Sequence, residues 1–315
     1  MKIIDFHCDT ILGLIKSKED ICLRSNNLSV DIEKLKKGNY MAQFFAMFVD
    51  LKEAATVADP LEVCLDMIDR FYLEIDKNKD DISLARNYDE MIKNQNEGKI
   101  SAFLTIEEGG VLKGKIQNLR NFYRLGVRLI TLTWNFPNEI GYPNCEKEYV
   151  DKGLTPFGLE IISEMNALGM IIDVSHLSDG GFYDVARLSQ KPFVASHSNA
   201  RTIKGHSRNL TDEMIKVLAD KGGVTGINFA RDFLGDSEIS KVCDMVEHIK
   251  HLRNMGGIDV ISMGTDFDGI SPELEIKNAG EMDKLIFALK ASGFTDDEID
   301  KILYKNAMRI IKEVC

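Results

Sequence analysis

The 315-residue chain has no CxxC pair of cysteines, no glycine-rich phosphate loop after its first apolar segment and no apolar run of membrane-spanning length. Its six cysteines are scattered, at positions 8, 22, 64, 145, 243 and 315. Such scattering excludes a disulfide framework and favours a reducing compartment. The N-terminus also lacks the basic-then-apolar pattern of a signal peptide. We therefore expect a cytoplasmic protein without a membrane partner.

Positive charge is in short supply as well. Lys and Arg number 39 against 50 Asp and Glu, which gives a formal net charge of −11. Because no basic stripe is present, nucleic acid is excluded as a partner. Core-forming residues, in contrast, are plentiful: 44% of the chain is hydrophobic and 28% is charged, as in a globular protein with a large core.

Eight apolar segments of strand character are separated mostly by helical segments. Strands are expected at residues 2–6, 40–49, 99–106, 127–133, 170–174, 192–196, 223–229 and 260–264. Helices are expected at 60–76, 87–95, 118–125, 156–169, 178–188, 211–219, 238–255, 281–291 and 295–312. This alternation predicts parallel βα units, and eight units predict one (β/α)₈ TIM barrel over residues 1–315. A doubly wound open sheet is the alternative.

Residues of metal-binding type follow five of these strands. They are His7 and Asp9 after the first strand, Glu107 after the third, His176 after the fifth, His197 after the sixth and Asp266 after the eighth. Side chains alternate along a strand, so His7 and Asp9 should point together while Cys8 points to the outer helices. By the same alternation, Glu108 should turn away from Glu107. The carboxyl ends of barrel strands meet at one mouth, which predicts a metal site there.

The number of ligands distinguishes one metal from two. A single ion held by two histidines and two carboxylates leaves His197 and Asp266 without a role. Two ions that share Glu107 use every residue: His7 and Asp9 complete the first ligand set, and His176 and His197 complete the second. Imidazole and carboxylate ligands suit zinc, and two such ions can deprotonate a water near neutral pH. Asp266 would then serve as general base.

At this point the sequence resembles the membrane (renal) dipeptidase family, the dinuclear-zinc branch of the metal-dependent amidohydrolase-like barrels. The motifs that carry the resemblance are His7-Cys8-Asp9, Glu107-Glu108-Gly109-Gly110, Asp173-Val174-Ser175-His176, Ser196-His197-Ser198, His206-Ser207-Arg208-Asn209 and Gly264-Thr265-Asp266-Phe267-Asp268-Gly269. The resemblance implies two Zn²⁺ ions per chain bridged by Glu107, and dipeptide hydrolysis by a metal-bridging hydroxide. It also implies tolerance of a D-residue at the C-terminal position, and it suggests a homodimer.

The resemblance further implies that Arg208 binds the substrate carboxylate, a task that suits a guanidinium fork. Other expected substrate contacts depart from the family pattern. Trp134 stands where well-known members carry a substrate-contacting histidine, and it either walls the pocket or packs in the barrel. Asn135 offers a polar contact, and Asn228 stands in place of a tyrosine-containing segment. The substrate preference expected from the family therefore does not carry over to this chain.

Two other classes of function remain as alternatives. Related barrels hydrolyse lactones, phosphotriesters or cyclic amides, but many of them bridge their metals through a carbamylated lysine, and no lysine ends a strand here. A barrel that binds metal without catalysis is the second alternative, and the water-activating set with Asp266 argues against it. The remaining histidine pair, His248 and His251, lies three residues apart on a helix and is interpreted as part of a solvated face.

Overall fold

Parallel strands close into a ring in the computed structural model, which describes residues 1–315. The ring contains β1 (Ile3–Cys8), β2 (Tyr40–Phe48), β4 (Ile100–Glu107), β5 (Val127–Thr131), β6 (Ile171–Asp173), β7 (Val194–Ala195), β8 (Val224–Ile227) and β9 (Ile261–Met263). It closes because β1 pairs with β9 and β2 pairs with both β1 and β4. The predicted (β/α)₈ barrel is therefore confirmed, and each expected strand corresponds to one strand of the ring.

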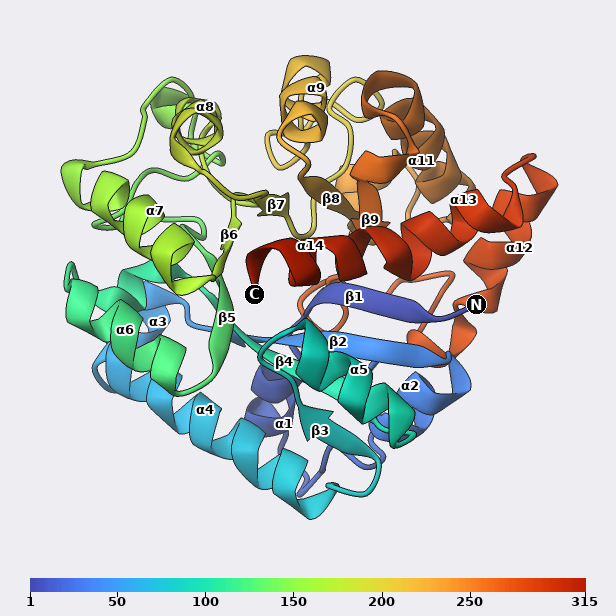
Figure 1. The fold of residues 1–315 in the computed structure, drawn as a ribbon, viewed down its shortest axis with the longest axis horizontal. Coiled ribbons are helices and arrows are strands. Elements are labelled where there is room, and N and C mark those ends of the chain that lie inside the picture. The colour runs from blue at the N-terminus through green and yellow to red at the C-terminus, as the bar shows by residue number, and fades with distance from the viewer.

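Helices surround the barrel, as Figure 1 shows. They are α1 (Thr10–Lys16), α2 (Ile32–Lys37), α3 (Leu51–Ala54), α4 (Pro60–Lys77), α5 (Tyr88–Asn96), α6 (Ile116–Arg124), α7 (Pro156–Leu168), α8 (Asp179–Leu188), α9 (Asp212–Asp220), α10 (Arg231–Leu234), α11 (Val242–Gly256), α12 (Asp283–Ala291), α13 (Asp296–Asp300) and α14 (Asn306–Val314). A short extra strand, β3 (Ile82–Leu84), pairs only with β4 outside the ring. No helix combines the length and apolarity needed to cross a membrane.

Local sequence signals set several helix ends. The Thr155 hydroxyl caps α7 by accepting the Gly158 N–H at 3.0 Å, Pro156 occupies the first turn, and Gly169 ends the helix with a φ of 73°. Other ends differ from the expected ones. The helix expected from residue 238 begins only at Val242, and the last expected helix is divided into α13, a π-helical turn at Lys301–Lys305 and α14.

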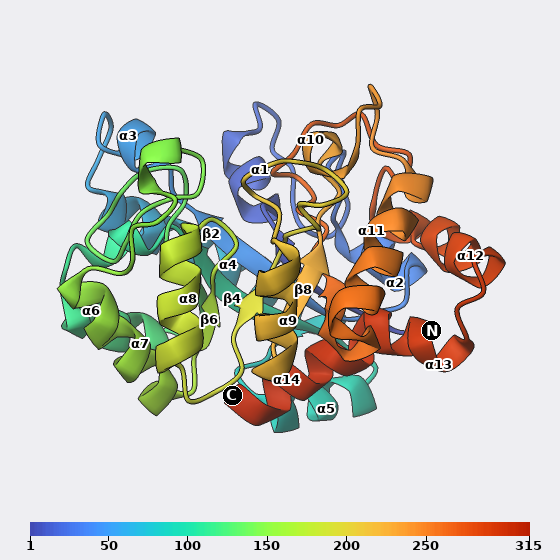
Figure 2. The same ribbon diagram turned by 90° about the horizontal axis from the view of Figure 1, so that it is seen from above.

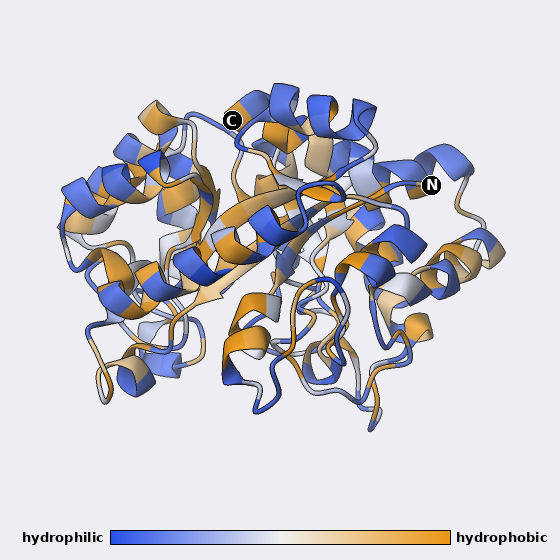
Figure 3. Ribbon diagram, turned by 90° about the horizontal axis from the view of Figure 1, so that it is seen from below, coloured by the Kyte–Doolittle hydropathy of each residue, from blue (hydrophilic) through white to orange (hydrophobic).

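Two layers of apolar side chains hold the barrel together. The inner layer comes from the barrel strands and is covered at their amino-terminal end by α14, with Ala307 and Ile310 packed against it. The outer layer lies between the strands and the surrounding helices. Figure 2 shows α14 at one end of the barrel and the long loops at the other, and Figure 3 shows the outward faces of the helices as mainly hydrophilic. The open end therefore lies at the carboxyl ends of the strands.

The expectation that His248 belongs to a solvated face is wrong. His248 lies on α11, is fully buried, and accepts the Ala200 N–H on Nδ1 at 3.1 Å while Nε2 donates to the Leu234 carbonyl at 2.9 Å. His251 lies nearer the surface, where its Nε2 is 2.7 Å from Asp212. Helical spacing placed the two histidines on one side of α11, but only the packing of the loop before α9 and of the end of α10 shows that His248 is enclosed.

The buried His248 predicts a loss of stability at acid pH. Burial lowers the pKa of His248 to about 4, with Asp244 opposing this shift and His251 adding to it. Since an unfolded chain protonates this histidine below pH 6.5, folding should weaken by up to about 3 kcal/mol as the pH falls from 6.5 to 4. Urea unfolding of the wild type and of His248→Gln checks this: the variant should be less stable at pH 7, and the difference should shrink by pH 4.5. An unchanged difference would contradict it.

Candidate metal centre

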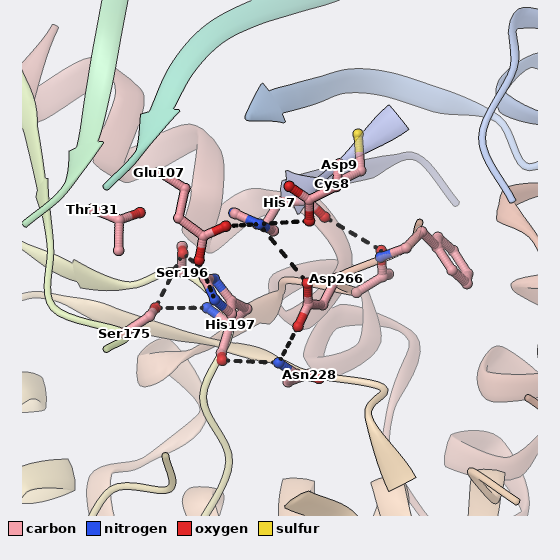
Figure 4. A network of polar contacts seen from close by, with 12 residues as sticks. His7, Cys8, Asp9, Glu107, Thr131, Ser175, Ser196, His197, Asn228 and Asp266 are labelled. Atoms are coloured by element: carbon pink, nitrogen blue, oxygen red, sulfur yellow. Dashed lines mark hydrogen bonds and ion pairs between the residues drawn. The ribbon is translucent and has the colours of Figure 1, made fainter. Parts of the chain in front are cut away.

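The six residues expected to form a metal site converge at the carboxyl end of the barrel. Figure 4 shows Glu107 between His7 and His197, with Asp9 and Asp266 beside His7 and Cys8 pointing away. His7 and Glu107 are the last inward-pointing residues of β1 and β4, while His176, His197 and Asp266 lie just beyond β6, β7 and β9. All are buried.

A bulge in β1 brings His7 to this site. Asp5 pairs with Gln43 and Cys8 pairs with Phe45, so β1 has one more residue than β2 between these two pairs. Phe6 packs in the inner apolar layer and Cys8 in the outer one, although strict alternation would place both on the same face. The extra residue lets Phe6 fill the barrel while His7 points to the mouth.

The two oxygens of Glu107 face different partners. Oε2 lies 3.3 Å from Nε2 of His7, which is itself 3.3 Å from Oδ2 of Asp9. Oε1 lies 2.9 Å from Nε2 of His176 and 3.5 Å from Nε2 of His197. One carboxylate therefore joins two groups of potential ligands.

Hydrogen bonds behind the rings determine which nitrogens can bind a metal. His197 Nδ1 is 2.7 Å from Ser196 Oγ, and this hydroxyl donates to Asp173 at 2.6 Å. A hydroxyl has a single proton to donate, so His197 Nδ1 must carry its own proton and Nε2 keeps a lone pair. His176 Nδ1 lies 3.2 Å from Asn135 Oδ1, which leaves Nε2 of His176 as an acceptor as well.

This donor set fits a cation. Nε2 of His176 and Nε2 of His197 are 3.1 Å apart and both face Glu107 Oε1, so three acceptors meet with no proton between them. Burial and the charge of Arg208 lower the pKa of His176 to about 4, which keeps its ring neutral. On the other side, Oδ1 of Asp9 is buried without a hydrogen-bond partner. Neutral imidazoles and carboxylates in such a cluster are ligands typical of zinc.

Asp266 lines the cavity beside the ligands. Its Oδ1 is 3.8 Å from His7 Nε2, and its backbone has a left-handed φ of 62°, a strained conformation common at active sites. Burial and the neighbouring Asp9 and Glu107 raise the pKa of Asp266 to about 7, against the effect of His7. A carboxyl with such a pKa can both accept and return a proton near neutral pH.

Asn228 lies elsewhere than expected. It was predicted to contact the substrate, but it is fully buried behind Asp266, does not line the cavity, and donates from Nδ2 to Asp266 Oδ2 at 2.8 Å and to the His197 carbonyl at 3.2 Å. Its Oδ1 accepts the Ala230 N–H. Asn228 therefore orients Asp266 and has no polar atom left for a ligand.

A cavity of about 580 Å³ opens over the cluster. Trp134 forms part of its wall and packs edge-on against Phe48 and Phe136, so of its two expected positions it takes the one in the pocket. Asn135 also lines the cavity while its side chain contacts His176. As expected, Glu108 turns away from the cluster, and it accepts the backbone N–H of Trp134 at 3.0 Å.

Arg208 also lines this cavity, with only 4% of its surface exposed. Nη1 donates to the Ser175 carbonyl and, at 3.3 Å, to Ser198 Oγ, while Nη2 donates to the His197 carbonyl at 3.3 Å. Nε has no partner. Nε is thus buried in the wall without a partner, and only one of the two Nη2 protons is used, so the guanidinium retains donors for a ligand.

Sequence reasoning assigned no role to Asp5, Asp173 or Ser196, which lie directly behind the ligands. Asp173 and Ser196 stand within the recognised motifs, and Asp5 is two residues before His7. A buried aspartate just before a ligand at the end of an apolar strand is the signal that could have drawn attention to them.

A parallel barrel with a buried histidine–carboxylate cluster at the carboxyl ends of its strands defines the class of barrel metallohydrolases. Within that class, residues 1–315 match the model of the membrane dipeptidase family, peptidase family M19. The chain belongs to this family and is a metallo-dipeptidase, a hydrolase of peptide bonds.

Known proteins similar to the chain include one named as a dipeptidase and one named as a metallo peptidase. It is 30% identical over 297 residues to an uncharacterized dipeptidase of Schizosaccharomyces pombe, covering 90% of this chain and 71% of that protein. It is 37% identical over 230 residues to an uncharacterized Klebsiella pneumoniae protein from the pqqA 5′ region, covering 69% and 84%. A metallo peptidase from Rhodobacter sphaeroides, solved with a phosphinate mimic of the dipeptide L-Ala-D-Ala, superposes with a TM-score of 0.92 at 26% identity, over 100% of this chain and 99% of that one.

Proposed function

We propose that this protein hydrolyses dipeptides with two zinc ions bound at the cluster. The ions would be held by His7, Asp9 and Glu107 on one side and by Glu107, His176 and His197 on the other. The observation that carries this proposal is the division of the two Glu107 oxygens between His7 Nε2 and His176 Nε2, at 3.3 and 2.9 Å. Bound zinc would supply a Lewis acid for the scissile carbonyl and lower the pKa of the attacking water.

The protein's own groups move the proton and hold the substrate. Asp266 accepts the proton of the attacking water and returns it to the leaving amine, a role supported by its place in the cavity wall. Asn228 keeps the Asp266 carboxylate oriented through the hydrogen bond to Oδ2. Burial of the cluster residues lowers the local dielectric and strengthens each of these interactions relative to the surface.

Arg208 binds the C-terminal carboxylate of the dipeptide through its free Nε and Nη2 edge. The backbone carbonyls of Ser175 and His197 hold the guanidinium in place before substrate arrives. Arg208 follows β7, whereas Phe48 ends β2 on the opposite side of the ring, and Trp134, which follows β5, packs against Phe48. The N-terminal residue of the substrate then contacts this aromatic wall, next to Asn135.

A D-residue is accepted at the C-terminal position in this proposal. Support comes from the Rhodobacter sphaeroides structure, whose ligand mimics L-Ala-D-Ala.

A dipeptide panel tests the proposal directly. Protein stripped with a chelator should be inactive, and addition of zinc to two equivalents should restore hydrolysis of L,L- and L,D-dipeptides, as followed by amine release and elemental analysis. If no member of the panel is hydrolysed at any zinc loading, the proposed function is wrong.

Arg208→Met separates a dipeptidase from a lactonase. Loss of a charge-assisted contact to a carboxylate should reduce dipeptide kcat/KM by about 10²-fold or more, because such buried contacts contribute about 3 kcal/mol. Arg231→Met is the matched control, since Arg231 lines the same cavity but donates to the Glu238 carbonyl. Equal effects of the two substitutions on dipeptide hydrolysis would remove the assigned role of Arg208.

A further inference from the structure

Asp5, in β1, makes a compact set of hydrogen bonds across the seam between β1 and β9. Its Oδ1 accepts the Thr265 N–H at 2.9 Å and the His7 N–H at 3.3 Å, and its Oδ2 accepts the Thr265 hydroxyl at 2.7 Å. Asp5 is fully buried and lies outside the set of proposed ligands. These three hydrogen bonds all come from the two backbone segments that carry His7 and Asp266.

Asp173, at the end of β6, makes the same set across the seam between β6 and β7. Its Oδ1 accepts the Ser196 N–H at 2.8 Å and the Ser175 N–H at 3.1 Å, and its Oδ2 accepts the Ser196 hydroxyl at 2.6 Å. Hydroxyls of Thr131 and Ser175 donate to it as well. The roles of Thr265 and Ser196 correspond atom for atom, although the two seams lie on different sides of the ring.

Both aspartates stand where the backbone pairing of the ring is thinnest. Within the named strands, each of the two seams has a single registered residue pair, Asp5 with Met263 and Asp173 with Val194, and beyond it the seam between β1 and β9 adds only the isolated bridge between Cys8 and Phe267. In both seams, the residue whose hydroxyl donates to the aspartate comes two positions after the residue that pairs with that aspartate. In the seam between β6 and β7 the side chain therefore continues the pairing beyond the last backbone pair, and in the seam between β1 and β9 it spans the gap between two backbone pairs.

The residue after each hydroxyl donor belongs to the active site. Asp266 follows Thr265, and His197 follows Ser196. We call the set of hydrogen bonds around Asp5, and the matching set around Asp173, a clamp. The clamp at Asp173 also determines which nitrogen of His197 carries the proton, because the Ser196 hydroxyl donates to Asp173 and so can only accept from His197 Nδ1. A clamp of this kind fixes both the position of the ring and the nitrogen that faces the cluster.

We propose that Asp5 and Asp173 are paired positioning residues, each of which holds one half of the metal centre. Asp5 aligns His7 and Asp266, and Asp173 aligns His197 and keeps its Nε2 free of a proton. The assignment of each aspartate to one metal site rests on the proposed two-ion function. The two sites should therefore respond separately: damage to one clamp should weaken one metal site and spare the other.

Calorimetric titration of chelator-stripped protein with zinc tests the separation. Asp173→Asn should weaken one of two binding events about 10- to 100-fold, and Asp5→Asn should weaken the other, in line with the usual effect of residues behind metal ligands. Ser101→Ala is the control, since it removes a buried hydrogen bond from Asn94 Nδ2 to Ser101 Oγ at 3.1 Å, at the other end of β4 from the cluster. Its titration should match that of the wild type.

Nitrogen-15 NMR of the histidines in the stripped protein gives a second measurement, one that needs no metal. The wild type should show His197 protonated on Nδ1. In Asp173→Asn the new amide donates to Ser196, whose hydroxyl then donates to His197 Nδ1, so the ring proton should move to Nε2. Ser196→Ala is the milder variant if the Asn variant does not fold, and it should give a mixture of the two forms.

Thr265 offers a similar test of the clamp at Asp5. Thr265→Val should weaken one zinc-binding event, and Thr265→Ser, which keeps the hydroxyl, should restore it. Unchanged zinc titrations in the clamp variants, or a His197 ring protonated on Nε2 in the wild type, would overturn the proposal. Neither measurement uses a dipeptide, so loss of the clamp hypothesis and loss of the dipeptidase hypothesis remain distinguishable.

Discussion

The Glu107→Gln variant is expected to lose tight binding of both metal ions and about 10³-fold or more of kcat/KM. Gln offers one oxygen where Glu offers two, so it cannot bridge His7 on one side and His176 on the other. The ions it would release stabilise the transition state by several kcal/mol, and each 1.36 kcal/mol corresponds to tenfold in rate. Elemental analysis and dipeptide kinetics check both parts of the expectation.

Thr105→Val is the control for this variant. Thr105 is also buried on β4, and its hydroxyl donates to the Phe45 carbonyl at 3.0 Å, away from the cluster. Its loss should cost about 1 kcal/mol of stability and leave the metal content unchanged. If Glu107→Gln keeps two equivalents of zinc, Glu107 is not the bridging ligand.

The Asp266→Asn variant should separate catalysis from metal binding. An amide cannot take up the proton of the attacking water, so kcat should fall about 10²- to 10⁴-fold, the usual contribution of a general base. In the proposed arrangement KM and the zinc content should change little, because Asp266 lies outside both proposed ligand sets.

Asp232→Asn is the control for loss of a negative charge. Asp232 lines the same cavity, but its side chain is 75% exposed and pairs with Arg231. It should leave kcat near the wild-type value, since an exposed ion pair contributes little. A drop in kcat of the same size in both variants would indicate a general effect of charge, and a loss of zinc in Asp266→Asn would place Asp266 among the ligands.

Much of the barrel could be predicted because its signals are local. Apolar runs such as 99–106 and 127–133 have the length and β-branched or aromatic content of buried parallel strands, and Thr155, Pro156 and Gly169 mark helix ends by their own chemistry. The start of α11 was missed because Lys241 precedes it without a side-chain cap. The strand β3 was missed because three residues carry too little periodicity to be recognised.

The site could be predicted in part for a topological reason. A residue at the carboxyl end of a parallel barrel strand lies at the mouth, so the positions of His7, Glu107 and His176 in the sequence sufficed to bring them together. Where a side chain at the mouth points depends on neighbours far away in the sequence. Asn228 was therefore expected to contact substrate, although it lies behind Asp266.

The sequence by itself determined the order of strands and helices, the end of the barrel that carries the polar cluster, and the residue types that meet there, because each depends on short-range pattern and on chain direction. The tertiary structure alone decided how these residues are held. The bulge that turns His7 inward, the clamps of Asp5 and Asp173, and the enclosure of His248 all depend on pairings between strands and loops distant along the chain. Such pairings follow from the closure of the ring, and no local stretch of sequence encodes them.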